Sequence, residues 1–225
     1  MRNGLKRTIK ILNLYAGIGG NRKLWPDDKI EVTAVELNPE IAKIYQNFFP
    51  KDKVVVADAH QYLLEHYEEF DFIWASPPCP THSRLNYPAF KKGNVRYPNM
   101  SLYQEIIFLT WCFKGKWVVE NVISYYNPLI KPKLLGRHYY WSNFHIQKIS
   151  QHINDDLANG TYKEMQEYHG FNLDNYNINK EYFNKKFNLQ QIKRLFLRNC
   201  VNPKHGLHIF NCAFKERQVT LNGLE

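Results

Sequence analysis

The stretch F-D-F-I-W-A-S-P-P-C-P-T-H-S at residues 70–83 decides how the chain is expected to fold. Phe70–Ser76 is a short apolar run that ends at turn residues, which is typical of a strand buried on both faces of a sheet. Pro77 and Pro78 end this strand, because proline has no N–H group to donate to a neighbouring strand. A free cysteine is usually a small buried hydrophobic residue, but prolines and a polar T-H-S segment surround Cys79. We therefore expect Cys79 to be a nucleophile at the edge of a sheet.

Four further apolar segments predict strands that flank this one in the sequence. They are Ile9–Tyr15, Glu31–Glu36, Lys53–Ala57 and Lys116–Val119. Helices are expected at about residues 38–49, 59–67 and 100–113, with Asn38 capping the first and Cys112 in the core beneath the third. Alternating strands and helices indicate an α/β fold with a mostly parallel sheet covered on both faces.

Five residues of types that often bind ligands stand at the carboxyl ends of five predicted strands. They are Gly17, Glu36, Asp58, Cys79 and Glu120. In open parallel sheets, ligands bind at the carboxyl ends of the strands. Glu36 stands where an acid holds ribose hydroxyl groups in Rossmann-like sites. Asp58 could accept a hydrogen bond from an adenine amino group, or it could cap the helix that follows.

The composition limits the class of protein. The 225 residues carry a net charge of +9, and no apolar run reaches the roughly 18 residues that a membrane-spanning helix needs. The N-terminus has no apolar signal segment, so we expect an intracellular, cytoplasmic protein. The four cysteines show no C-x-x-C spacing, which argues against a zinc site or a disulfide framework, and no metal is expected.

Residues 80–99 form a basic segment directly after the predicted nucleophile. The segment contains Arg84, Lys91, Lys92 and Arg96 and no acidic residue. Basic side chains alone could simply form a solvated surface. Their position next to Cys79 instead favours a nucleic acid as the substrate.

Six short motifs occur in the order in which the DNA cytosine-5 methyltransferases carry theirs. L-Y-A-G-I-G-G resembles the family's cofactor loop, V-E-L-N-P-E its ribose-binding motif, S-P-P-C-P its nucleophile motif and V-V-E-N-V its glutamate motif. G-R-H-Y-Y-W-S-N-F, a predicted aromatic strand, stands in the place of the arginine motif, and N-C-V-N-P resembles the C-terminal motif. The chain thus resembles a small bacterial or phage member of this family. The resemblance implies a Rossmann-like S-adenosylmethionine-dependent methyltransferase fold with a small, irregular recognition segment.

The resemblance also implies a division of the chain and of its chemistry. Residues 1–145 would form the catalytic and cofactor-binding domain, residues 146–190 a target-recognition segment, and residues 191–225 a segment that returns to the catalytic domain. Cys79, whose pKa a position at a strand end can lower, would add to C6 of cytosine. Glu120 would hold N3 and the exocyclic amine, and Arg137 would contact the O2 side. The methyl donor would be S-adenosylmethionine, which leaves as S-adenosylhomocysteine.

Two further sets of residues are expected to bind the cofactor and the nucleic acid. The cofactor set is Tyr15, Ala16, Gly17, Ile18, Gly19, Gly20, Glu36, Leu37, Asp58, Ala59, Pro77, Asn199 and Val201. The nucleic acid set is Ser83, Arg84, Lys91, Lys92, Arg96 and Asn121.

The expected partner is double-stranded DNA with the target cytosine flipped out of the helix. A restriction-modification or phage-protection role, a cognate restriction enzyme or partner subunit, and a monomeric state complete this expectation. Three alternatives stay open. An RNA cytosine-5 methyltransferase has the same chemistry. An amino methyltransferase fits Ser76-Pro77-Pro78 but has an aromatic residue in place of Cys79. A non-catalytic nucleic acid-binding protein needs neither Cys79 nor Glu120.

Overall fold

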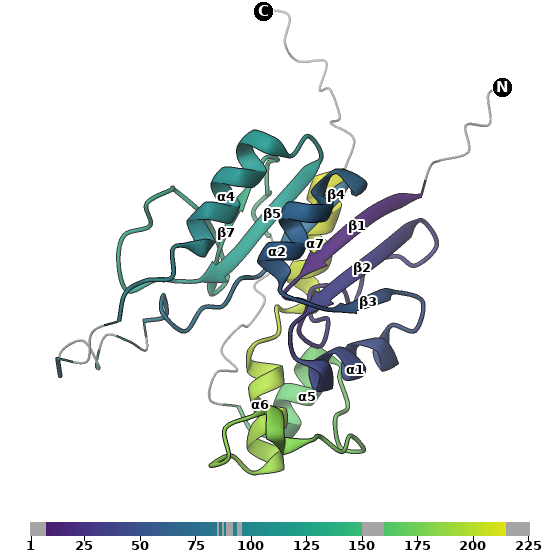
Figure 1. Cartoon of the computed structure of the whole chain (residues 1–225), viewed down its shortest axis with the longest axis vertical. Coiled ribbons are helices and arrows are strands. Elements are labelled where there is room, and N and C mark those ends of the chain that lie inside the picture. Colours follow the sequence, from purple (N-terminus) through teal and green to yellow (C-terminus); the bar gives the residue numbers. More distant parts are fainter. Residues whose placement is uncertain are drawn as a thin grey trace, which may run out of the picture.

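A seven-stranded sheet forms the centre of the part of the chain that the computed structural model describes, which is residues 8–84, 86, 88, 92–93, 96–149 and 160–214 (Figure 1). Its order is β3-β2-β1-β4-β5-β7-β6. The strands are β1 (Ile9–Leu14), β2 (Ile30–Glu36), β3 (Lys53–Val56), β4 (Phe72–Ala75), β5 (Lys116–Val122), β6 (Lys133–Leu135) and β7 (His138–Ser142). Strands β1 to β5 pair in parallel, whereas β7 pairs antiparallel with β5 and β6. The mostly parallel sheet confirms the predicted α/β fold.

Helices cover both faces of this sheet (Figure 1). They are α1 (Pro39–Phe48), α2 (Ala59–His66), α4 (Ser101–Cys112), α5 (Tyr162–His169), α6 (Leu189–Arg198) and α7 (Pro203–Phe214), with 3₁₀ turns at Tyr67–Glu69 and Lys180–Tyr182. Helices α2 and α4 share one core with the sheet, and α7 shares a second core on the other face. Helices α5 and α6 share a third core with α1. The described part of the expected recognition segment therefore packs against α1.

Strand β4 is apolar along its whole length because both of its faces are covered. Ile73 and Ala75 belong to the core beneath α2 and α4, and Phe72 and Trp74 belong to the core beneath α7. All four side chains are fully buried. This arrangement explains why the sequence of β4 shows no alternation between apolar and polar residues.

Several element boundaries agree with the sequence and two details differ. The side chain of Asn38 caps α1 as expected and accepts from the N–H groups of Glu40 and Ile41. The predicted strand at 136–146 is a hairpin instead, since Gly136 and Arg137 form the turn between β6 and β7. Cys112, expected in the core, is exposed, because it lies in the last turn of α4 on the outward side.

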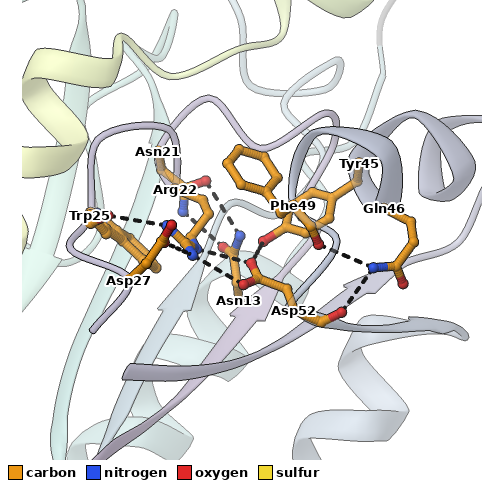
Figure 2. Close-up of polar contacts among 9 residues, drawn as sticks. All are labelled: Asn13, Asn21, Arg22, Trp25, Asp27, Tyr45, Gln46, Phe49 and Asp52. Carbon is orange, nitrogen blue, oxygen red and sulfur yellow. Dashed lines mark hydrogen bonds and ion pairs between the residues drawn. The ribbon is translucent and has the colours of Figure 1, made fainter. Parts of the chain in front are cut away.

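A buried ion pair fixes the segment that follows the glycine loop (Figure 2). Arg22 is 3% exposed, and its Nε and Nη2 donate to the two carboxylate oxygens of Asp52 at 2.9 and 3.0 Å. The hydroxyl of Tyr45 donates to the same carboxylate at 2.8 Å. This network ties the segment after β1 to the connection between α1 and β3, and the sequence alone gave no sign of it.

Among the described residues, no helix has the length and apolar character to cross a membrane.

Candidate active site

The register of the sheet brings Cys79 and Glu120 to the same edge. Ala75, the last residue of β4, pairs with Val119 of β5, so Ser76 continues beside Glu120 and Cys79 lies three residues further on. Glu120 is 6% exposed and still lies within β5. The turn after β4 thus holds a thiol beside a buried carboxylate.

The electrostatics of Cys79 differ from expectation. Burial raises the pKa of the thiol, and the negative charge of Glu120 raises it further. A backbone hydrogen bond and the positive charge of Arg198 act in the opposite direction but do not outweigh these effects. The expected lowering of the pKa by the strand-end position is therefore wrong for this structure, because desolvation and a like charge disfavour the thiolate. Arg198, at the end of α6, is a nearby cation that the sequence did not reveal.

Asn121 holds the turn that carries the thiol. Its side-chain amide donates to the carbonyl oxygen of Pro77 at 2.9 Å, and its side-chain oxygen accepts from the N–H of Val122 at 3.0 Å. The side chain is 2% exposed. Asn121 is among the expected nucleic acid-binding residues, and the structure shows its buried side chain in contact with the turn that carries Cys79.

A second set of contacts joins the loops that follow β4 and β5. The ring Nδ1 of His82 and the hydroxyl of Tyr126 lie 2.6 Å apart, and the N–H of Tyr125 donates to the carbonyl of His82 at 3.0 Å. Ser83, an expected nucleic acid contact, forms a β-bridge with Ser124. Burial lowers the pKa of His82, which favours the neutral ring. The sequence analysis did not identify His82, because its contact with Tyr126 forms only when the loops after β4 and β5 come together in the fold.

His138, the first residue of β7, lies beside Glu120. The Nε2 of His138 lies 3.5 Å from Oε1 of Glu120. Arg137 is exposed in the turn between β6 and β7. His138 pairs with Val122, two residues beyond Glu120, so both side chains lie on one face of the sheet as diagonal neighbours. A hairpin assignment with its turn at Gly136-Arg137 would have revealed this contact from the sequence.

The glycine loop and Glu36 lie together at the ends of β1 and β2. Tyr15, Gly17 and Gly19 have positive φ angles of 56°, 55° and 88°. The N–H of Gly17 donates to Oε2 of Glu36 at 3.0 Å, and the N–H of Asn38 donates to Oε1 at 2.9 Å. Burial raises the pKa of Glu36 despite these hydrogen bonds. The loop therefore curls over the carboxylate and fixes its direction.

A buried carboxyl group on α4 joins this edge, which sequence reasoning also missed. The hydroxyl of Tyr15 donates to Oε1 of Glu105, and Nδ1 of His60 lies 3.1 Å from the same oxygen. Glu105 is fully buried, and among the described residues its other oxygen has no hydrogen-bond partner. Burial raises the pKa of Glu105. A glutamate within an apolar helix was the available sequence signal.

Four more of the expected residues are placed by the structure, and a fifth lies outside the described residues. Asp58 caps α2, since its Oδ1 accepts from the N–H of Gln61 at 2.9 Å, as one of its two interpretations required. Arg84, Lys92 and Arg96 are exposed. Lys91 lies outside the described residues.

Comparison with known proteins identifies the family. The family model for C-5 cytosine-specific DNA methylases matches residues 9–135, more than half of the 225-residue chain. The chain belongs to this family. Its cofactor is accordingly S-adenosylmethionine.

Individual relatives of the chain are more distant. It is 31% identical over 80 residues to a tRNA (cytosine(38)-C(5))-methyltransferase of Spodoptera frugiperda, a match that covers 33% of this chain and 24% of that protein. The methyltransferase EhMeth of Entamoeba histolytica is 13% identical, with a TM-score of 0.56 over 92% of this chain and 98% of that one. A Spodoptera frugiperda DNMT2 variant is 15% identical, with a TM-score of 0.56 over 92% and 100%. At these identities the two structures show a shared fold.

The edge formed by β1 and β2 fits the cofactor of this family. A Cβ atom added to Gly17 would meet no atom within 4 Å, so space remains in front of the loop. One added to Gly20 would lie 2.5 Å from the carbonyl oxygen of Val201, so the C-terminal motif packs against the loop. Leu37 and Val56 are 66% and 55% exposed beside Glu36. This edge thus offers a glycine loop, an oriented carboxylate and apolar side chains to a nucleoside.

Proposed function

We propose that the protein methylates C5 of cytosine in double-stranded DNA. One observation carries the proposal: the thiol of Cys79 and the carboxylate of Glu120 lie within electrostatic reach of each other at one edge of the sheet. Membership of the C-5 cytosine-specific DNA methylases supports the same chemistry. A modification role beside a cognate restriction enzyme or in phage protection, as a monomer, is part of this proposal.

In the proposed reaction, Cys79 attacks C6 as the thiolate, and the electron pair of the C5–C6 double bond moves toward C5 and the ring. S-adenosylmethionine, when bound, would supply an electrophilic methyl group to C5, and the sulfur that loses this methyl group would leave as S-adenosylhomocysteine. Glu120 would accept from the exocyclic amine and, once protonated, would donate its proton to N3, which stabilises the negative charge that develops on the ring as the thiolate adds. Loss of the C5 proton to a base then restores the double bond and expels the thiolate of Cys79.

His138 is proposed to orient Glu120 in this reaction. Its ring nitrogen lies 3.5 Å from the carboxylate, within reach of a small adjustment that would form a hydrogen bond. An imidazole at this position would fix the direction in which the carboxyl group of Glu120 faces the base. This role differs from the one expected of Arg137, which is a contact to the O2 side of the base.

The cofactor and the nucleic acid are proposed to approach from different sides of Cys79. Gly17, Glu36, Leu37 and Asp58 would hold the nucleoside part of the cofactor. Arg84, Lys92 and Arg96 would contact phosphate groups, which positions the strand without reading its sequence. A cytosine in a duplex must leave the stack to reach Cys79.

A tRNA substrate is the second candidate function. The Spodoptera frugiperda relative that matches 80 residues is named as a tRNA cytosine-5 methyltransferase. The chemistry at Cys79 and Glu120 would be unchanged. An amino methyltransferase is disfavoured, since the family model that matches this chain describes C-5 methylation.

The test compares methyl transfer from labelled S-adenosylmethionine to duplex DNA and to tRNA. We expect label in cytosine C5 of DNA, and sequencing of the methylated DNA would then identify the site. DNA with 5-fluorocytosine at that site should form a covalent adduct with the wild type, because fluorine blocks the elimination step.

The Cys79→Ala variant is the control for this adduct. It should bind S-adenosylmethionine normally and form no adduct. Label only in tRNA would select the second candidate. An adduct with Cys79→Ala would refute the assignment of the nucleophile.

A further inference from the structure

A pocket of about 400 Å³ lies beside the loop that follows Cys79. Its lining residues are Arg84, Ser124, Tyr125, Tyr126, Asn127 and Tyr139. Cys79 and Glu120 are not among the described residues that line it. Tyr139 and His138 are successive residues of β7 and point to opposite faces of the sheet. The pocket is therefore distinct from the site at which His138 approaches Glu120.

The walls of this pocket are held in place by contacts from buried residues. His82 is 1% exposed, and its ring nitrogen lies 2.6 Å from the hydroxyl of Tyr126. The hydroxyl of Ser124 donates to the carbonyl of Tyr126 at 2.6 Å. The bridge between Ser83 and Ser124 keeps Arg84 beside this loop. A ligand would therefore meet preformed walls and order few side chains on binding.

The chemistry of the lining is that of a site for an unstacked base. Three tyrosine rings line the pocket, and the rings of Tyr125 and Tyr126 are 5.1 Å apart and nearly perpendicular, at 84°. Single-stranded nucleic acid binds by stacking bases on aromatic side chains and on arginine. Asn127 offers an amide that can pair with the edge of a base. Among the described residues that line the pocket, none is acidic, which suits a polyanion.

We propose that this pocket binds an unstacked nucleobase adjacent to the target cytosine in the substrate strand. Tyr125 stacks on the base, and Arg84, exposed at the rim, contacts the base or its phosphate. The proposal rests on the proposed function, since it assumes a nucleic acid substrate, and it applies equally to DNA and RNA. Binding of the neighbour keeps the strand open while the target cytosine is at Cys79.

The test first removes the base next to the target cytosine and then removes the aromatic ring of Tyr125. Wild-type protein is assayed with the nucleic acid identified above, with an abasic nucleotide placed on each side of the target cytosine. At one of the two positions, we expect kcat/KM to fall about 5- to 100-fold, the effect of one lost base stack. With the intact substrate, Tyr125→Leu should lower kcat/KM by a similar factor. In this variant, the same abasic nucleotide should lower kcat/KM by less than about twofold more.

The controls separate this proposal from the function itself. Tyr125→Phe, which keeps the ring, and Trp111→Leu, which removes an aromatic residue 84% exposed on α4, should both retain the abasic penalty. If the protein methylates the intact substrate and kcat/KM does not fall at either abasic position, the proposal for the pocket is refuted and the proposed function is not affected. A full penalty in Tyr125→Leu would also refute the proposal for the pocket. Absence of methyl transfer to any nucleic acid would instead refute the proposed function.

A second measurement uses the wild-type protein, so it does not depend on a variant that folds. 5-Iodouracil is placed at the position that showed the penalty, and the complex is irradiated. We expect crosslinks to peptides that contain residues 124–127 or Tyr139. Crosslinks confined to other peptides would refute the pocket as the site of the neighbouring base.

Discussion

At the residue scale, the negative charge of Glu120 disfavours the thiolate form of Cys79 in the protein without substrate, although the two groups are proposed to act together. Both burial and the charge of Glu120 raise the pKa of Cys79. The thiolate fraction at neutral pH is therefore lower than for an ordinary cysteine, and it rises as the pH approaches the raised pKa. When cytosine is bound, its N3 and amine would engage Glu120 and reduce this repulsion. The thiol would then become reactive mainly in the presence of its substrate.

Replacement of the carboxylate should change two rates in opposite directions. Glu120→Gln removes the negative charge, so the pKa of Cys79 should fall and alkylation of Cys79 by iodoacetamide at pH 7 should be faster. Each unit of the pKa shift corresponds to about tenfold in the equilibrium between thiol and thiolate. Methyl transfer should slow by about 10²- to 10³-fold, because a group that stabilises the reacting ring is lost.

Peptide mass spectrometry can follow Cys79 separately from the exposed Cys112, which serves as the internal control and should react at the same rate in both proteins. The wild-type alkylation rate should rise with pH. Slower alkylation in Glu120→Gln would contradict the electrostatic coupling.

At the scale of elements, a buried polar network follows the glycine loop in the chain (Figure 2). Arg22 follows the loop directly and is paired with Asp52, which precedes β3. Both side chains are 4% exposed. The loop is thus held between the strand that precedes it and an ion pair that follows it.

Removal of one partner of this pair should destabilise the protein strongly. Asp52→Asn removes the buried carboxylate from Arg22 and leaves the guanidinium only the largely exposed carboxylate of Asp27, which lies at 2.6 Å. Breaking a buried ion pair costs about 3–5 kcal/mol. Asp28→Asn is the matched control, since Asp28 pairs with Lys29 on the surface at 3.9 Å and both side chains are largely exposed. Urea unfolding should show a large loss of stability for Asp52→Asn and no measurable change for Asp28→Asn. Equal stability of the two variants would refute the structural role of the network.

At the scale of the whole molecule, segments from both ends of the chain build the cofactor site. A Cβ atom at Gly20 would lie 2.5 Å from the carbonyl oxygen of Val201, and α7 follows immediately at Pro203. The C-terminal segment therefore closes against the first loop of the sheet. Binding at this junction should couple to the stability of the whole fold.

S-adenosylmethionine should accordingly raise the melting temperature. A ligand at 100 times its Kd stabilises a protein by about 2.7 kcal/mol, which corresponds to about 5–11 °C for a chain of this size. Glu36→Gln should reduce the shift, because Glu36 is the oriented acid at the cofactor edge. Glu31→Gln, at the other end of the same strand, is the control and should keep the full shift. A thermal shift assay measures both, and an unchanged shift in Glu36→Gln would contradict its role.

The sequence by itself determined the α/β fold, the five parallel strands and the placement of Gly17, Glu36 and Glu120 near one edge. These features follow from local patterns, because buried strands, prolines and glycines leave signals within a few residues. The cap at Asn38 was predictable for the same reason.

Only the tertiary structure decided which side chains meet. Three contacts depend on strand register and on helix packing, which join residues far apart in the chain. They are those of His138 with Glu120, of Asn121 with Pro77 and of Glu105 with Tyr15. The raised pKa of Cys79 likewise depends on burial and on a charge from another strand. Such contacts have no local signature, so the pattern of residues predicts the edge where the site forms but not the partners within it.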